Sequence, residues 1–460
     1  MKNKRNVLPM DNSFSLKNRE LCRDAIRGFS NLPLFKGRYC VQDIDFSVPV
    51  TMCELPNYAT LAGNRILFAM NELDYLLLPH KEHEYAAFSS RYSDEKIAQA
   101  GMGVPYLEKY LFSFLKKEIQ LSDNWCIRSV EEYFSSYSRE TRLIETLPSA
   151  EVVLNSAVSG ISACDWLVQL APELLTKSSP VARYTSGNYG DISSTVFKVS
   201  IKELGYGEHN REQSTLFTDT MTSAGLSAEP HKYWQYYLNG SLLLANYYNS
   251  ITRNRRHFFK YVGALFQAEL GLVASYGIRQ DALKKALPEL NVRYFDEHCH
   301  VDIDHSRMIF EGLVRPVIEK YGNVAAKEIV RGFEEARLIA EYAENDFVQQ
   351  IKWKDNAQVN KEVYRDIWPK VQSAFQSGDI VRDVFDEPTG MDSITYSNDG
   401  YKLIHVSSGE VEFVNGFQMS STLKANDGII VEPKRLYGAM IRSTSCRYEM
   451  YSIDEIKKWL

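Results

Sequence analysis

Apolar residues recur at helical spacing over most of the first three quarters of the chain. From about residue 15 to residue 350, long apolar-periodic stretches alternate with short clusters of Gly, Pro, Ser and Asn, which is the pattern of helices joined by turns. The stretch at residues 324–350 is dense in Glu, Lys and Arg, as expected for a helix with one solvated face. We predict helices that include residues 99–117, 233–248, 256–276 and 324–350.

The pattern changes near residue 380, where short runs of β-branched and aromatic residues replace the helical stretches. Turn sequences such as Ser-Ser-Gly, Val-Asn-Gly and Asn-Asp-Gly separate these runs, so a small β-sandwich or barrel is expected. Residues 353–378 read as a connector with some helix. The protein is therefore predicted to be mainly α-helical with a C-terminal all-β domain, whose strands include residues 402–406, 411–414, 428–431 and 447–452.

Composition restricts the class of protein. A chain of 460 residues can form two to four domains, and 44% hydrophobic with 24% charged residues is ordinary for a globular protein. The net charge of -6 argues against nucleic acid as the main partner. No uninterrupted apolar run is long enough for a membrane span, and the basic N-terminus lacks the apolar block of a signal peptide. Seven cysteines without paired spacing indicate reduced thiols, so a cytoplasmic protein is expected.

The segment from Arg293 to His305 carries the most specific chemical pattern. In a helix, His298, Asp302 and His305 occupy positions i, i+4 and i+7 and project from one face. Nitrogen and oxygen ligands without a thiolate suit iron, manganese or zinc. The alternative is a solvated helix face that happens to be rich in His and Asp. One helix face cannot hold a metal alone, so ligands from other helices are required.

Two carboxylates upstream could complete such a site. Glu269 lies in a nearly all-apolar helical run, where a buried carboxylate is costly unless it is paired or bound to metal. Its alternative role is to face water or a gap between helices. Glu203 ends an apolar helix just before a Gly-rich turn, and by itself it reads as an ordinary helix-end residue. Carboxylates and a His-Asp-His face on different helices together form the pattern of carboxylate-bridged di-iron proteins.

The motifs Glu-Leu-Gly-x-Gly at Glu203, the lone Glu269, and Tyr-Phe-x-x-His-x-x-x-Asp-x-x-His from Tyr294 resemble those of the haem-oxygenase-like di-iron oxidases. The C-terminal stretch around Ile-His-Val-Ser-Ser-Gly is similar to a cupin. The resemblance implies a helical bundle that binds iron rather than haem. It implies an N-terminal helical region at 1–145 that serves dimerisation, an oxidase domain at 146–350, a connector at 351–379 and a cupin-like domain at 380–460.

The resemblance also implies the metal ligands. Gln213 stands where the family has a histidine, and glutamine is the poorer iron ligand, so the second iron site is expected to be weak. His209 or Glu212 could substitute if the connection shifts. In the β-domain, Thr395, Ser397 and Tyr437 replace the histidines that an iron-binding cupin needs, and His405 reads as a packing residue, so no metal is expected there. The implied ligands are Glu203, Glu269, His298, Asp302 and His305.

From this resemblance we expect a non-haem iron oxygenase, with one or two irons and O₂ as co-substrate, that oxygenates an amine or guanidine nitrogen of an amino-acid-like metabolite. Its expected state is a homodimer, and its reductant and substrate are not indicated. Oxidative C–C cleavage or desaturation of an amino or fatty acid in the same fold is the nearest alternative. A polar, charged pocket favours an amino acid, whereas a long apolar tunnel favours a fatty acid. The other alternative is a metal-depleted binding or scaffold protein.

Overall fold

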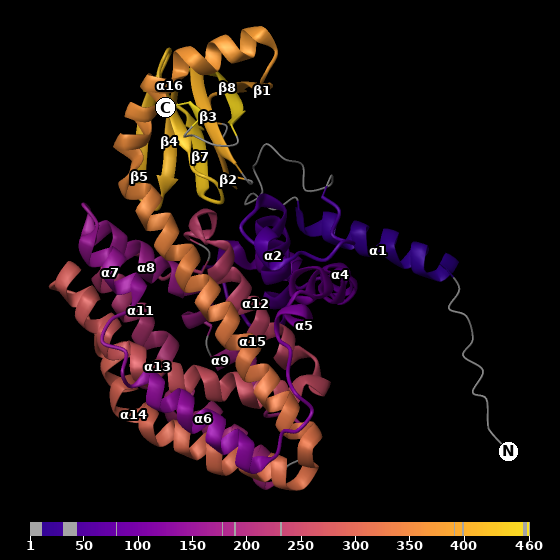
Figure 1. The fold of residues 1–460 in the computed structure, drawn as a ribbon. Coiled ribbons are helices and arrows are strands. Elements are labelled where there is room, and N and C mark those ends of the chain that lie inside the picture. Colours follow the sequence, from indigo (N-terminus) through magenta and orange to yellow (C-terminus); the bar gives the residue numbers. More distant parts are fainter. Residues whose placement is uncertain are drawn as a thin grey trace.

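The structure is a computed structural model that describes residues 12–30, 44–79, 81–176, 178–187, 190–230, 232–390, 392–397, 400–453 and 458–459. Inside helices and strands, the side chains of residues 12–19, 30, 178, 272–274, 299–305 and 392–393 lie outside the described set. Figure 1 shows a body of packed helices with a β-sandwich at one end.

Helices are the secondary structure of the described residues up to residue 377. The first part contains α1 (Asn12–Ser30), α2 (Tyr58–Asn71), α3 (Tyr85–Arg91), α4 (Asp94–Phe112), α5 (Leu115–Glu118) and α6 (Ile127–Thr141). The central part contains α7 (Pro148–Asn155), α8 (Ser159–Leu174), α9 (Ser178–Ala182), α10 (Asp191–Glu203), α11 (Gln213–Ser223), α12 (Asn239–Arg253), α13 (Phe258–Ala286) and α14 (Arg293–Ile309). A π-helical turn, Phe310–Val314, leads into α15 (Arg315–Asp355), which is followed by α16 (Ala357–Ser377).

Helices α13 and α15 pack with their backbones in direct contact. A Cβ atom added at Gly263 would lie 1.8 Å from the carbonyl oxygen of Ile329, and one added at Gly332 would lie 1.9 Å from that of Lys260. Only glycine fits at both positions, so the two helices approach more closely than side chains would allow. Near this crossing, Phe266 and Phe333 belong to one large buried core. The crossing therefore fixes the position of α13 in the bundle.

The C-terminal strands form two antiparallel four-stranded sheets, in the orders β1-β8-β3-β6 and β2-β7-β4-β5. Eight strands in two sheets form a double-sheet sandwich of the kind to which jelly rolls belong. The strands are β1 (Arg382–Pro388), β2 (Asp392–Tyr396), β3 (Tyr401–Ser408), β4 (Glu410–Gly416), β5 (Met419–Lys424), β6 (Gly428–Val431), β7 (Leu436–Ile441) and β8 (Ser445–Ile453).

Both outer faces of the sandwich are covered by helices. The β1-β8-β3-β6 sheet packs against α16, where Leu403 and Tyr451 share a core with Ile367. The other sheet packs on the helical bundle, where Tyr396 and Leu436 join the core that surrounds α8 and α12. Figure 1 shows α15 running from the bundle to the sandwich, with α16 continuing alongside the strands. The β-domain is thus held on both faces by helices.

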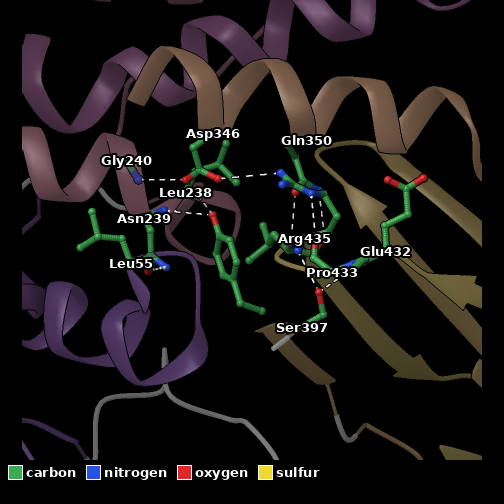
Figure 2. Close-up of polar contacts among 12 residues, drawn as sticks. Leu55, Leu238, Asn239, Gly240, Asp346, Gln350, Ser397, Glu432, Pro433 and Arg435 are labelled. Atoms are coloured by element: carbon green, nitrogen blue, oxygen red, sulfur yellow. Dashed lines mark hydrogen bonds and ion pairs between the residues drawn. The ribbon is translucent and has the colours of Figure 1, made fainter. Parts of the chain in front are cut away.

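A buried polar network joins the sandwich to the bundle through α15 (Figure 2). The Gly240 N–H and the Tyr396 hydroxyl both donate to Asp346 Oδ2, at 3.0 and 3.1 Å. One turn later, the Gln350 amide donates to the carbonyl oxygens of Asn415 and Leu436 and accepts from the Leu436 N–H, each at 2.9 Å. Burial alone would make these groups costly, but their mutual hydrogen bonds satisfy them.

The predicted fold class is confirmed: the protein is mainly α-helical, and residues 382–453 form antiparallel sheets. The predicted helices at 99–117 and 233–248 differ from the structure in their bounds, because α4 ends at Phe112 and α12 begins at Asn239. The predicted connector comprises the last turn of α15 and the helix α16, whose buried face packs on the sandwich. His405 is a packing residue, since its ring stacks on Trp368 with the ring centres 4.1 Å apart.

In the part of the chain that the structure describes, no helix combines the length and the apolar composition needed to cross a bilayer. The cysteines within that part, Cys22, Cys53, Cys126, Cys164 and Cys446, are all free thiols.

Gly263→Ala should strongly destabilise the protein, because the new methyl group collides with the Ile329 carbonyl oxygen and α13 must move away from α15. We expect a loss of about 3 kcal/mol or more in the free energy of unfolding, measured by chemical denaturation. The matched control is Gly277→Ala on the same helix, where an added Cβ meets nothing within 4 Å. It should be neutral or stabilise by up to about 1 kcal/mol. Equal denaturation midpoints for the two variants would contradict the crossing.

Asp346 should make stability depend on pH. Burial raises the pKa of this carboxyl above its ordinary value of 3.8. Its contribution to stability is therefore fully present below that value and is lost as the pH rises through the raised pKa of the folded protein. Asp346→Asn keeps an oxygen for Gly240 and Tyr396 but cannot ionise.

Thermal melts are recorded from about pH 4 to about pH 8. The stability of Asp346→Asn relative to the native protein should increase as the pH rises. Asp346→Ala, the control, leaves both donors without an acceptor and should lose about 2 kcal/mol or more at every pH. A constant difference between Asp346→Asn and the native protein would refute the pH dependence.

Candidate active site

Three of the predicted ligand residues come from three helices and are buried. Glu203 is the last residue of α10, Glu269 lies in the middle of α13, and His298 lies in α14. Their side chains are only 4%, 4% and 3% exposed. The expectation that Glu203 is an ordinary helix-end residue therefore does not describe its surroundings. The short connection from α13 to α14 and the close α13–α15 crossing place Glu269 and His298 inside the bundle, and α10 brings Glu203 there by packing rather than by a short link.

Glu203 and Glu269 line the same cavity, which we call the carboxylate cavity. It is lined by Pro172, Glu173, Thr176, Pro180, Val181, Val199, Glu203, Ala245, Tyr248, Asn249, Tyr261, Leu265, Ala268 and Glu269. Burial raises the pKa of Tyr261 well above its ordinary value, and the negative charges of Glu203 and Glu269 act in the same direction. Tyr261 is thus a protonated phenol within electrostatic range of both carboxylates.

His298 is held in a fixed orientation. Its Nδ1 lies 2.6 Å from the carbonyl oxygen of Tyr294, and because a carbonyl can only accept, Nδ1 carries the proton. The rings of Tyr294 and Tyr276 flank the imidazole, with ring centres 4.4 and 4.7 Å from its own. A backbone carbonyl on one ring nitrogen is the usual partner of a histidine that binds metal through the other nitrogen. Nε2 is therefore the nitrogen that could bind a metal.

Gln213 connects this histidine to the first carboxylate. Its Oε1 lies 2.8 Å from His298 Nε2, and its Nε2 donates to Glu203 Oε1 at 3.2 Å. Gln213 thus lies between two predicted ligands. Because an amide oxygen, like the Tyr294 carbonyl, can only accept, both imidazole nitrogens of His298 face acceptor oxygens, and a metal at Nε2 has to replace the proton and the Gln213 contact there. Of the two proposed substitutes, His209 is exposed and contacts Glu212 and Thr215, and Glu212 is the half-buried residue directly before α11.

The donor set suits iron in its chemistry. Two carboxylates and an oriented imidazole are the ligand types that non-haem iron takes in helical bundles. Asp302 and His305 follow His298 on α14, but their side chains lie outside the described residues. Among the described side chains, no three His, Cys, Asp or Glu groups lie close enough together to form a complete metal site. The described residues therefore include three of the five predicted ligands, and α14 carries the other two candidates.

A second, larger cavity adjoins the first. This arginine cavity has a volume of about 520 Å³ and lies among α6, the start of α7, α8, α12, α13 and α15. It shares Glu173, Tyr248 and Ala268 with the carboxylate cavity. Its charged lining residues are Glu173, Arg279, Arg337, Glu341 and Glu344. The cavity therefore presents charged groups of both signs on a wall that is otherwise largely apolar.

Sequence reasoning missed Glu173 and Arg279. Glu173 lies at the end of α8 in the run Trp-Leu-Val-Gln-Leu-Ala-Pro-Glu-Leu-Leu, and it lines both cavities. A lone carboxylate in an apolar helix is the same signal that drew attention to Glu269, so the sequence could have indicated it. Arg279 lies among ordinary helix residues, and no local pattern separates it from other arginines.

Comparison with known proteins agrees with this geometry. Residues 164–340 match the family described as iron-containing redox enzymes, and this segment includes Glu173, Glu203, Glu269 and His298. Over 411 residues the chain is 38% identical to nitrosourea synthase of Streptomyces achromogenes subsp. streptozoticus, covering 88% of this chain and 86% of that protein. The protein therefore belongs to the haem-oxygenase-like iron-containing redox enzymes, and it is an oxygenase.

Proposed function

We propose that this oxygenase uses O₂ to oxygenate an amine or guanidine nitrogen of an amino-acid-like metabolite. The observation that carries the proposal is the burial of Glu203 and Glu269 on one cavity, with the oriented His298 linked to Glu203 through Gln213. The related nitrosourea synthase, whose name describes a product with an oxygen-bearing nitrogen, supports reaction at nitrogen. The charged lining of the arginine cavity supports an amino-acid substrate over a fatty acid.

In this proposal, Glu203, Glu269 and His298 hold iron together with Asp302 and His305, which follow His298 by one and two turns on α14. Iron bound there would supply the redox chemistry that activates O₂. The carboxylates offset the positive charge, and the Tyr294 carbonyl keeps His298 Nε2 directed away from its own backbone. Tyr261 presents a hydroxyl that stays protonated, because burial and the two carboxylates raise its pKa. Gln213 is expected to leave any second iron weakly held.

The proposal includes the domain boundaries: an N-terminal helical region at 1–145, an oxidase domain at 146–350, a connector at 351–379 and a cupin-like domain at 380–460. It also includes a cytoplasmic location and a homodimer. The β-domain is proposed to bind no metal. The sandwich then serves the bundle by covering it, through the Asp346 and Gln350 contacts to β2, β4 and β7.

The ligand assignment predicts the effect of removing one imidazole. His298→Ala should reduce iron retained after anaerobic reconstitution and desalting by at least tenfold, because ligand nitrogens dominate affinity at such sites. Its helical circular dichroism should stay close to that of the native protein. The control is His209→Ala, which removes an exposed imidazole and should leave iron content unchanged. Stoichiometric iron in His298→Ala would show that the assignment is wrong.

The reaction itself is tested with isotope-labelled O₂. Reduced, iron-loaded protein should consume O₂ faster when a basic amino acid is present, and the product should gain labelled oxygen on nitrogen. The measurement is mass spectrometry over a panel of amino acids, guanidines and fatty acids. Label found only in water, with a shortened or desaturated product, would indicate oxidative cleavage or desaturation. Bound iron without O₂ consumption for any substrate would indicate a non-enzymatic role.

A further inference from the structure

The arginine cavity contains two cations with different surroundings. Arg337 is neutralised within the protein, because it pairs with Glu334 at 2.7 Å and with Glu341 at 2.6 Å. Arg279 has no carboxylate partner among the described residues, and its Nε is buried without a hydrogen-bond partner there. Its guanidinium carbon lies 5.6 Å from the centre of the Trp166 ring, which holds the side chain in place. Arg279 is therefore a positioned cation with unused hydrogen-bond donors.

The carboxylate groups of the same cavity are placed differently. Glu344 accepts from the Ser149 N–H at 2.7 Å, and Glu341 is paired with Arg337. Among the charged residues that line the arginine cavity, Glu173 also lines the carboxylate cavity. An anion that enters the arginine cavity thus meets Arg279 as the cation whose charge the described carboxylates have not offset.

Helix α13 connects Arg279 to the proposed iron site. Ala268, Gly271, Ser275 and Arg279 all line the arginine cavity, at steps of three and four residues, so they form one face of the helix. Ten residues separate Arg279 from Glu269, which corresponds to about 15 Å along the helix axis. Helical side chains lean toward the N-terminus, so Arg279 points back toward the level of Glu269. The remaining gap suits a molecule with an acid at one end and a nitrogen several atoms away.

We propose that Arg279 binds the α-carboxylate of the substrate in the arginine cavity, and so directs the distal nitrogen of a basic amino acid toward the carboxylate cavity. This rests on the proposed function for the identity of the reacting group. Arg279 is a specificity-determining and positioning residue. Its planar guanidinium can bind a carboxylate through two parallel hydrogen bonds, which lysine cannot do.

The test uses pairs of probes that differ only in the carboxylate: L-arginine with agmatine, and L-lysine with cadaverine. Binding is measured by calorimetry on the full-length protein, without added iron or O₂. The native protein should bind at least one amino acid more tightly than its decarboxylated partner. The Arg279→Gln variant should bind that amino acid at least about 30-fold more weakly, and its affinity for the amine should stay unchanged. Arg279→Lys should recover part of the preference, because it restores the charge without the fork.

Two controls separate this role from a structural one. Lys284→Gln removes an exposed cation from the same helix and should alter neither affinity. Gly271 faces the cavity between Arg279 and Glu269, and a Cβ added there meets only Gln267 Nε2, at 3.4 Å. The Gly271→Ala variant should therefore still bind both probes. The Gly271→Leu variant should bind the amino acid and the amine more weakly by similar factors, since the leucine side chain fills the cavity.

The inference is overturned if no amino acid binds more tightly than its amine. It is also overturned if Arg279→Gln lowers the affinity for both members of a pair equally. Failure of the proposed function is distinguishable, because it appears only in the labelled-O₂ experiment. If the preference for a carboxylate depends on Arg279 but no labelled oxygen is incorporated, this inference stands and the proposed function fails. Oxygenation of agmatine as readily as of arginine, unaffected by Arg279→Gln, would leave the function standing and refute the inference.

Discussion

The backbone contact between α13 and α15 is the constraint on which the rest of the protein depends. Gly263 and Gly332 allow the two helices to touch without side chains between them. Helix α13 carries Glu269 and Arg279 beyond this contact, and α15 carries Arg337 beyond it. Because a helix is rigid over this length, fixing one crossing fixes the level at which each of these side chains enters the bundle. The two cavities follow from that placement.

The second constraint is the buried polar network at the C-terminal end of α15, which we call the polar joint. Asp346, Gln350 and Lys354 recur every four residues and therefore share one face of the helix. Lys354 is completely buried, and its ammonium lies 3.4 Å from Asp165 of α8. Hydrogen bonds and ion pairs of this kind add modest net stability, but they are strongly directional and penalise any other docking of the sandwich. The joint therefore specifies orientation more than it adds stability.

Much of the fold could be predicted from the sequence, and so could several residues of the candidate site. Periodicity predicted the long helices and the β-rich C-terminus, because both patterns are local. Glu269 was indicated by its apolar run, and His298 by its spacing to Asp302 and His305. The burial of Glu203 could not be predicted, since it depends on how α10 packs against other helices. Arg279 could not be singled out for the same reason: its significance comes from Trp166 and from a cavity lined by residues of several helices.

The joint also has a consequence for the evolution and engineering of this architecture. The sandwich begins in sequence near residue 382, but the surface that holds it is built from α15 and from residues at the start of α12. A chimera cut at the loop before β1 would bring a foreign sandwich onto an interface that still presents Asp346, Gln350 and Lys354. The unit that can be exchanged between relatives is therefore the sandwich together with the second half of α15, and its two parts are expected to change in concert.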